Sequence, residues 1–119
     1  MKIAVTSKGK DLNAEVDPRF GRAAYIIIVD TDTLAFEVID NAANKDAFKG
    51  AGIQAAVSIC DKEATVLLTG FCGPNAFKTL EAAEVNVAND ATGTIQNAID
   101  QYKAGKFEFA TAANTDGHW

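Results

Sequence analysis

Residues 69–77, TGFCGPNAF, place two glycines, a cysteine and a proline in one predicted strand-to-helix turn. An apolar run predicts a strand over residues 65–69, and Pro74 suits the first position of a helix, where proline's missing N–H is no loss. The first N–H groups of a helix have no partner within it, so an anion at this turn would meet free donors and the positive end of the helix dipole. Gly70 and Gly73 are expected to supply backbone conformations that other residues disfavour. The turn therefore predicts an anion site, and the alternative is a tight turn that only needs glycine.

Cys72 adds a soft ligand to this turn. A thiol beside the N–H groups of a helix N-terminus is expected to have a lowered pKa, which favours thiolate formation, metal ligation and redox chemistry. The alternative is that Cys72 is a small turn residue. Cys60 falls on the apolar face of a predicted helix and is expected to be a buried small hydrophobe. We expect both cysteines to be reduced thiols.

A second group of residues, VDPRFGRA at 16–23, precedes an apolar strand. Arg19 and Arg22 flank Phe20 and Gly21. Two guanidinium groups are therefore expected next to the start of the following strand, with an exposed aromatic ring between them. The alternative is that the proline and the glycine only form turns in a loop and that the arginines are solvated. The sequence leaves these two interpretations open.

Residues for catalysis are scarce. The single histidine, His118, stands next to the last residue, so neither a Ser/His/Asp triad nor a Cys/His pair can be assembled around it. Two cysteines twelve residues apart and one terminal histidine do not make a zinc site either. The sequence favours binding over catalysis.

The composition limits the classes of partner. With 119 residues and 48% hydrophobic content, the chain is expected to form one globular domain. The net charge is −5 and the 11 basic residues are scattered, which disfavours nucleic acid and an anionic membrane surface. No apolar run approaches the ~20 residues of a membrane span, and no signal peptide precedes the first strand. We therefore expect a cytoplasmic protein.

The expected elements alternate in a way typical of an α/β fold. The β-branched run at 23–30 is the candidate for the central strand, and it forms a hairpin with residues 35–40. Asp90 or Thr92 is expected to cap the last helix, and Gly105 to end it. The remaining expected strands lie at 2–6, 65–69 and 85–88, and the helices at 49–62, 74–84 and before 105. This order predicts a single domain, residues 1–105, with a mixed five-stranded sheet and helices on both faces, followed by a weakly ordered tail at 106–119.

Five segments of this sequence carry a resemblance to a known family. They are MKIAV at the start, RFGRA at 19–23, the strand that ends at Asp30, Gly-x-x-Gly-Pro-Asn-Ala at 70–76 and Ala-Thr-Gly-Thr at 91–94. Over nearly its whole length the chain resembles the dinitrogenase iron–molybdenum cofactor biosynthesis proteins, small domains that bind metal–sulfur clusters or their precursors. The resemblance implies a ribonuclease H-like motif. The first strand, residues 2–6, lacks the carboxylate that two-metal nucleases need, so nuclease activity is not expected.

The resemblance also implies a cofactor and a set of site residues. Many relatives have a histidine where this chain has Arg19, and a cysteine at position 72 is not a general family feature. Fixed positive charge with one soft sulfur suits an anionic thiometallate, so the expected cofactor is a mixed molybdenum–copper sulfide cluster with Cys72 as a metal ligand. The implied cluster-binding residues are Arg19, Phe20, Gly21, Arg22, Gly70, Phe71, Cys72, Gly73, Pro74, Asn75 and Ala76.

Three functions remain open at this point. The first is non-enzymatic binding or carriage of the anionic cluster, with charge from the arginines, an apolar wall from Phe20 and Phe71, and N–H donors from Gly73, Asn75 and Ala76. The second is a metal-free protein-interaction or regulatory module of the same fold, whose acidic surface meets a basic protein partner. The third is a redox enzyme that uses Cys72.

Overall fold

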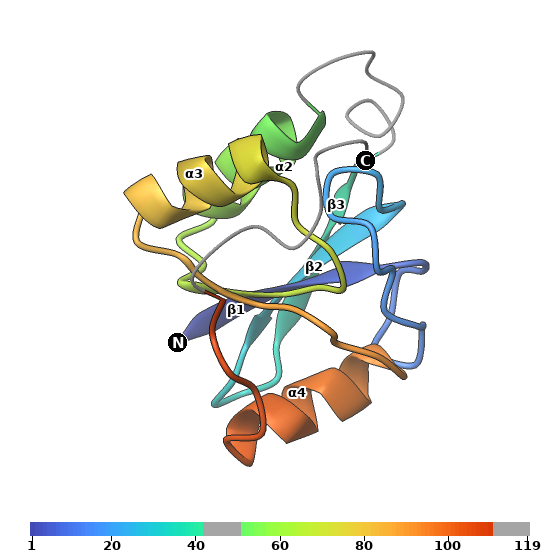
Figure 1. Cartoon of the computed structure of the whole chain (residues 1–119). Coiled ribbons are helices and arrows are strands. Elements are labelled where there is room, and N and C mark those ends of the chain that lie inside the picture. The colour runs from blue at the N-terminus through green and yellow to red at the C-terminus, as the bar shows by residue number, and fades with distance from the viewer. Residues whose placement is uncertain (42–50, 111–119) are drawn as a thin grey trace.

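A mixed five-stranded sheet with strand order β3-β2-β1-β4-β5 forms the middle layer of the computed structural model (Figure 1). The structure describes residues 1–41 and 51–110. The strands are β1 (Lys2–Ser7), β2 (Tyr25–Asp30), β3 (Phe36–Asp40), β4 (Val66–Leu68) and β5 (Asn86–Ala88). The helices in the described part are α2 (Ala51–Asp61), α3 (Pro74–Ala82) and α4 (Ile95–Lys103). The expected single α/β domain with a mixed five-stranded sheet is confirmed.

The first strand, β1, is the central strand of the sheet. It pairs antiparallel with β2 and parallel with β4, so Ala4 lies between Ile28 and Leu67. β2 and β3 form the expected antiparallel hairpin, and β4 and β5 are parallel. The prediction that residues 23–30 form a strand inside the sheet is confirmed, since β2 is paired on both sides, but the middle place in the strand order belongs to β1. An apolar run indicates that both faces of a strand are covered, which β2 satisfies, but it does not determine the strand order.

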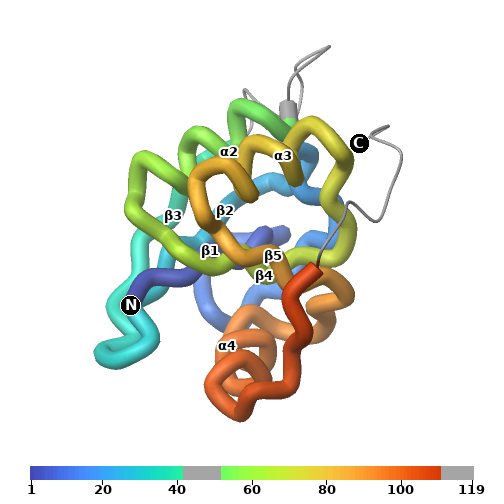
Figure 2. Tube along the Cα trace, turned by 60° about the vertical axis from the view of Figure 1, so that its left-hand side comes forward, coloured from blue at the N-terminus to red at the C-terminus, as the bar shows by residue number. Residues whose placement is uncertain are grey.

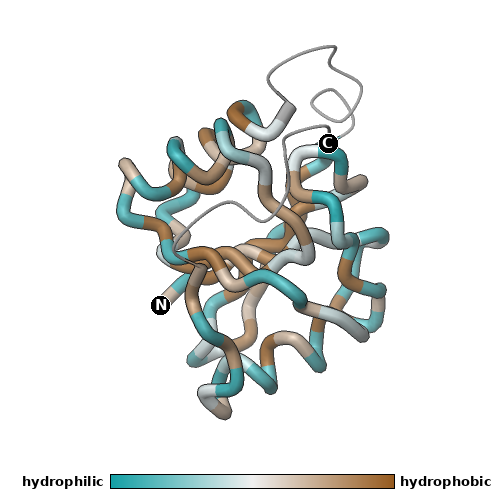
Figure 3. The backbone as a smooth tube through the Cα atoms, viewed as in Figure 1, coloured by the Kyte–Doolittle hydropathy of each residue, from teal (hydrophilic) through white to brown (hydrophobic). Residues whose placement is uncertain are grey.

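Helices cover both faces of the sheet, as expected. α2 and α3 lie on one face and α4 lies on the other (Figures 1 and 2). Since side chains alternate along a strand, β2 sends Ile26 towards α2 and α3 and Ile27 towards α4. Each face therefore has its own apolar core, and the hydrophobic segments of the chain gather along the sheet between the helix layers (Figure 3).

Two helices differ in detail from the expectation. Thr94 caps α4, with its hydroxyl accepting the N–H of Asn97 at 3.1 Å, whereas Asp90 or Thr92 was expected. Asp90 (φ 65°) and Gly93 (φ 84°) are left-handed, so the chain is still turning there and the helix begins later. Gly105 follows the end of α4 with φ 73°, as expected.

The described part of the predicted tail packs against the domain. Phe109 forms a bridge to Ala88, and the N–H of Ala110 donates to the carbonyl of Val87 at 2.7 Å. These residues extend the outer edge of β5, which is more order than the sequence indicates. The rest of the predicted tail, including His118, and the polar stretch after Asn41 lie outside the described residues.

No helix in the described ranges is long and apolar enough to cross a bilayer.

Candidate functional site

The parallel strands β1, β4 and β5 all end on the same side of the sheet, at Ser7, Leu68 and Ala88. We call this side the carboxyl end. The antiparallel strand β2 begins there, because Tyr25 pairs with Ser7. The loop before β2 and the turn after β4 therefore meet at the carboxyl end, which is where ligands bind in open α/β sheets.

Backbone hydrogen bonds join the two segments that the sequence singled out. The N–H of Phe71 donates to the carbonyl of Pro18 at 2.6 Å, and the N–H of Phe20 donates to the carbonyl of Phe71 at 3.1 Å. Arg19 and Phe71 thus form a one-residue parallel bridge. The arginine segment and the glycine-rich turn, which are about fifty residues apart in the chain, therefore lie side by side.

Gly70 is required at this junction because of close approach. A Cβ atom at position 70 would lie 2.6 Å from Cβ of Pro18 and 2.8 Å from its carbonyl oxygen, so a side chain there would force the two segments apart. Gly70 is not left-handed, and Gly73 has φ −73°, so the expectation that these two glycines adopt disfavoured conformations is wrong. A glycine signal in a sequence does not distinguish special dihedral angles from a near neighbour.

The two arginines are the only arginines in the sequence, and both lie at the carboxyl end. The Arg19 side chain is 48% exposed, and its Nε lies 3.4 Å from Oδ1 of the buried Asp17. Arg22 is half-buried, and its N–H donates to the carbonyl of Arg19 at 3.1 Å across a turn in which Gly21 has φ 90°. The left-handed Gly21 is what allows the chain to turn between the two arginines.

The two predicted aromatic residues have different environments. Phe20 is 1% exposed and packs in the core beneath α2 and α3, so the prediction of an exposed ring between the arginines is wrong. Phe71 is 37% exposed and lies at the surface. Only Phe71 can form an apolar wall beside a ligand, since Phe20 is taken up by the core.

The turn leads into α3 as expected, with Gly73 at the N-cap and Pro74 in the first turn. No side chain within the described residues caps this helix. Its first intrahelical bond runs from the N–H of Phe77 to the carbonyl of Gly73 at 2.9 Å. The N–H groups of Asn75 and Ala76 therefore belong to the set at a helix N-terminus that has no partner within the helix.

The thiol of Cys72 differs from the expectation in its burial and in its pKa. The residue is fully buried, its Sγ lies 3.8 Å from the carbonyl oxygen of Gly73, and burial raises its pKa to about 12. The expectation of a lowered pKa is wrong, because burial removes water from the thiol and so disfavours the charged thiolate. The prediction that Cys72 ligates a metal is not tested by this geometry, but the thiol is neutral near pH 7.

Cys60 is partly exposed, and burial and the nearby charge of Asp61 raise its pKa. Neither cysteine, both being among the described residues, forms a disulfide. Within residues 1–41 and 51–110, no group of three or more His, Cys, Asp or Glu side chains is arranged to hold a metal ion.

The sequence does not single out several buried polar residues around this site, and four of them bear on its geometry. Asn41 donates from Nδ2 to the carbonyls of Gly21 and Ala23, at 3.1 and 2.9 Å, and so supports the turn between the arginines. The others are Thr6, Asp17 and Thr69, which are buried where β1 and β4 end. A signal for the two threonines was present, because each ends an apolar strand run with a hydroxyl.

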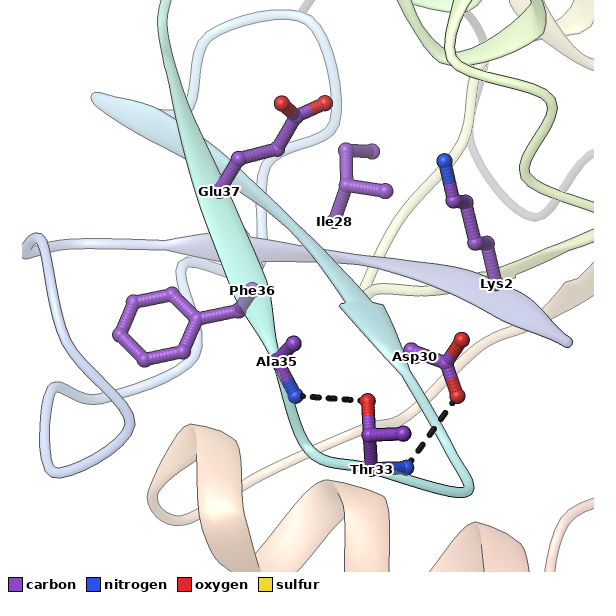
Figure 4. Close-up of a pocket in the computed structure, with 7 residues that line it drawn as sticks. All are labelled: Lys2, Ile28, Asp30, Thr33, Ala35, Phe36 and Glu37. Carbon is purple, nitrogen blue, oxygen red and sulfur yellow. Dashed lines mark hydrogen bonds between the residues drawn. The ribbon is translucent and has the colours of Figure 1, made fainter.

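A hollow of about 250 Å³ lies at the opposite end of the sheet, around the β2–β3 hairpin (Figure 4). Lys2, Ile28 and Glu37 point to one side of the sheet there, and Phe36 points away. Asp30 accepts the N–H groups of Asp32 and Thr33, at 2.8 and 3.3 Å, and these bonds lower its pKa. The carboxylate thus stabilises the hairpin turn. None of the predicted site residues lines this hollow.

Comparison with known proteins points to one family. The family model described as dinitrogenase iron-molybdenum cofactor matches residues 1–105. The apo form of the orange protein from Desulfovibrio gigas is 43% identical over 96% of each chain, with a TM-score of 0.93. A Thermotoga protein that belongs to the DUF35 family is 40% identical over 98% of each chain, with a TM-score of 0.83.

A more distant structure shows the same fold. A protein from Methanocaldococcus jannaschii is 15% identical over 94% of this chain and 96% of its own, with a TM-score of 0.71. A search of curated proteins returned no match.

Proposed function

The chain belongs to the dinitrogenase iron–molybdenum cofactor family, and from this premise we propose that it binds and carries an anionic metal–sulfur cluster at the carboxyl end, without catalysing a reaction. Family membership and the likeness to the orange protein, whose structure was solved in an apo form, support metal-cluster binding. The finer proposal is that the cluster is a mixed molybdenum–copper sulfide. In this proposal the protein carries the cluster as cargo and does not use it as a catalytic cofactor.

The observation that carries the proposal is the pair of backbone bonds between Phe71 and the arginine segment. Because of these bonds, the segment that carries Arg19 lies beside the turn that begins α3. Guanidinium groups and helix N–H groups are both donors that prefer negatively charged acceptors. The net charge of −5 repels anions elsewhere, so a local positive site is needed to hold one.

The donor set fits a thiometallate better than a bare metal ion. A thiomolybdate unit brings its own sulfide ligands, so the protein has to supply charge, N–H donors and shielding from water. In this proposal Arg19 and Arg22 supply the charge, Asn75 and Ala76 the N–H groups, and Phe71 the apolar wall.

Cys72 has a secondary part in this proposal. Its sulfur is buried behind the turn, so direct copper ligation requires the turn to open and the thiol to lose its proton. We therefore propose that Cys72 borders the cluster and that the arginines and N–H groups hold it.

The experiment that tests the proposal is reconstitution of the apo protein with tetrathiomolybdate and copper. The expected result is a charge-transfer absorption band and bound molybdenum and copper that stay with the protein through gel filtration. The matched control is Lys103→Ala, which removes one positive charge from the exposed last turn of α4. Loss of colour and metal from the wild-type protein during gel filtration would refute the proposal.

A metal-free interaction module is the second candidate. Ile53 and Val57 lie one turn apart on α2 and are 37% and 42% exposed, which favours a contact with another protein. Elemental analysis of the protein purified from its native source distinguishes the two functions, since an interaction module contains no molybdenum or copper.

A further inference from the structure

Asp17 is a buried carboxylate at the proposed cluster site that the sequence does not single out. The residue is 2% exposed, and its Oδ1 accepts the N–H of Arg19 at 3.1 Å and lies 3.4 Å from Nε of the same residue. Carboxylates are rarely buried this fully unless they are paired, because they lose their hydration. A negative charge is also unfavourable beside a site that binds anions. Its presence there needs an explanation.

The backbone of Asp17 is fixed to the end of the central strand. Its N–H donates to the carbonyl of Thr6 at 2.9 Å, and the hydroxyl of Thr6 donates to the carbonyl of Asp17 at 2.5 Å. The Thr6 and Thr69 hydroxyl oxygens are 2.9 Å apart. Since the single hydroxyl proton of Thr6 goes to Asp17, Thr69 must be the donor in this pair. The ends of β1 and β4 thus hold Asp17 in one place.

This arrangement determines what Arg19 can do. Asp17 contacts the guanidinium at Nε, which is the inner nitrogen, while 48% of the Arg19 side chain is exposed. The guanidinium is planar and rigid, so a contact at Nε sets the direction of the two terminal nitrogens. In the part of the chain that the structure describes, those two nitrogens have no protein acceptor, and they are the pair that binds anions in a forked geometry.

We propose that Asp17 is a positioning residue that holds the Arg19 guanidinium with its terminal nitrogens directed towards the bound anion. The inference rests on the proposed function, because the anion is the thiometallate cluster. Asp17 itself does not touch the cluster. Its carboxylate lowers the local positive potential and so weakens the attraction for the anion. This loss is outweighed by a gain in entropy, because the long Arg19 side chain is already ordered before the cluster binds.

The Asp17→Asn variant separates this role from a simple charge effect. The variant keeps the size and an acceptor oxygen but removes the negative charge. If Asp17 acted only through its charge, the variant would bind tetrathiomolybdate with copper more tightly than the wild type. Positioning predicts the opposite, with affinity about tenfold weaker because a charge-assisted bond is lost.

The same substitution in an Arg19→Ala background tests whether Asp17 acts through Arg19. We expect it to change the affinity by less than about twofold there, because the group that Asp17 positions is gone. Tighter binding by Asp17→Asn, or an equal loss with and without Arg19, would overturn the inference.

A readout on the apo protein tests the contact between Asp17 and Arg19 separately from cluster binding. In 15N NMR spectra, the Nε–H signal of Arg19 should exchange slowly with water in the wild type and much faster in Asp17→Asn. Equal exchange in both proteins would overturn the inference. If the wild type fails to bind the thiometallate, the proposed function fails, while this exchange measurement still decides whether Asp17 holds Arg19.

Arg19→Lys is the second variant, and it covers the case in which Asp17→Asn does not fold. It leaves the buried carboxylate in place and keeps the positive charge, but lysine has no Nε–H fork to be oriented. We expect about the same tenfold loss as in Asp17→Asn, and unchanged affinity would contradict the inference.

Discussion

Gly70 and Pro18 are packed so closely that a Cβ atom on residue 70 would lie 2.6 Å from Cβ of Pro18. The neighbouring N–H of Phe71 donates to the Pro18 carbonyl at 2.6 Å. This contact brings the arginine segment against the turn that begins α3. The proposed site therefore depends on a long-range contact between two short loops as much as on either motif.

The first prediction concerns this contact. Gly70→Ala should lower the free energy of unfolding by about 1–3 kcal/mol, because the methyl group forces the two loops apart. It should also weaken cluster binding. Urea unfolding gives the stability, and titration with tetrathiomolybdate and copper gives the affinity.

Gly105→Ala is the matched control for Gly70→Ala. A Cβ at position 105 meets nothing within 4 Å, so only its φ of 73° is penalised, at a cost of about 1–2 kcal/mol. This variant should lose stability and keep its affinity for the cluster. Equal affinity in both glycine variants would argue against the junction as part of the site.

The second prediction concerns the arginines. Arg19→Ala and Arg22→Ala should each weaken cluster binding about tenfold, because each removes a charge-assisted donor. The wild-type affinity should fall as salt is raised, since exposed charges are screened. Titrations at two ionic strengths, with Lys103→Ala as the control, measure both effects. Equal losses in Lys103→Ala would show that only net charge matters.

The third prediction concerns the pKa of Cys72. Because its pKa in the folded protein is about 12, against an ordinary 9.0, the folded state holds the thiol proton more tightly than the unfolded state. The resulting stability is fully present below about pH 9 and is lost as the pH rises towards 12, by up to about 1.4 kcal/mol per unit. Urea unfolding at pH 8 and pH 10.5 should show this loss in Cys60→Ser but not in Cys60→Ser/Cys72→Ala. An identical pH dependence in the two proteins would contradict the burial of this thiol.

The fourth prediction concerns the contact between Cys72 and the metal. If the sulfur only borders the cluster, Cys72→Ala should keep the copper-to-molybdenum ratio of the wild type and bind within about threefold of its affinity. Elemental analysis after gel filtration measures the ratio. A selective loss of copper would show that Cys72 is a ligand, as the sequence predicts.

Features that depend on neighbouring residues could be predicted from the sequence. Pro74 at the start of α3 and Gly105 at the end of α4 follow local backbone rules, and both are confirmed. The mixed five-stranded sheet with helices on both faces followed from the alternation of strand and helix patterns, and family membership from the motifs. The ribonuclease H-like label and the boundary at residue 105 remain predictions.

Features that depend on long-range contacts could not be predicted. Phe20 was expected at the surface because arginines flank it, but the bridge from Arg19 to Phe71 directs the ring into the core. The pKa of Cys72 depends on burial by elements far away in the sequence. The sequence around Asp17 indicates only a loop. Its backbone hydrogen bond to Thr6 at the end of β1 is a long-range contact that the sequence does not show. A sequence motif identifies candidate residues, but which of them are buried depends on contacts made by the whole fold.

Cluster binding at the carboxyl end is tested by a map of backbone amide shifts in 15N-labelled protein as tetrathiomolybdate and copper are added. We expect the largest shifts in residues 18–22 and 70–76, at the carboxyl end, and we expect them to disappear in the Arg19→Ala/Arg22→Ala variant. Largest shifts around the β2–β3 hairpin at the opposite end of the sheet, or no shifts at all, would contradict it.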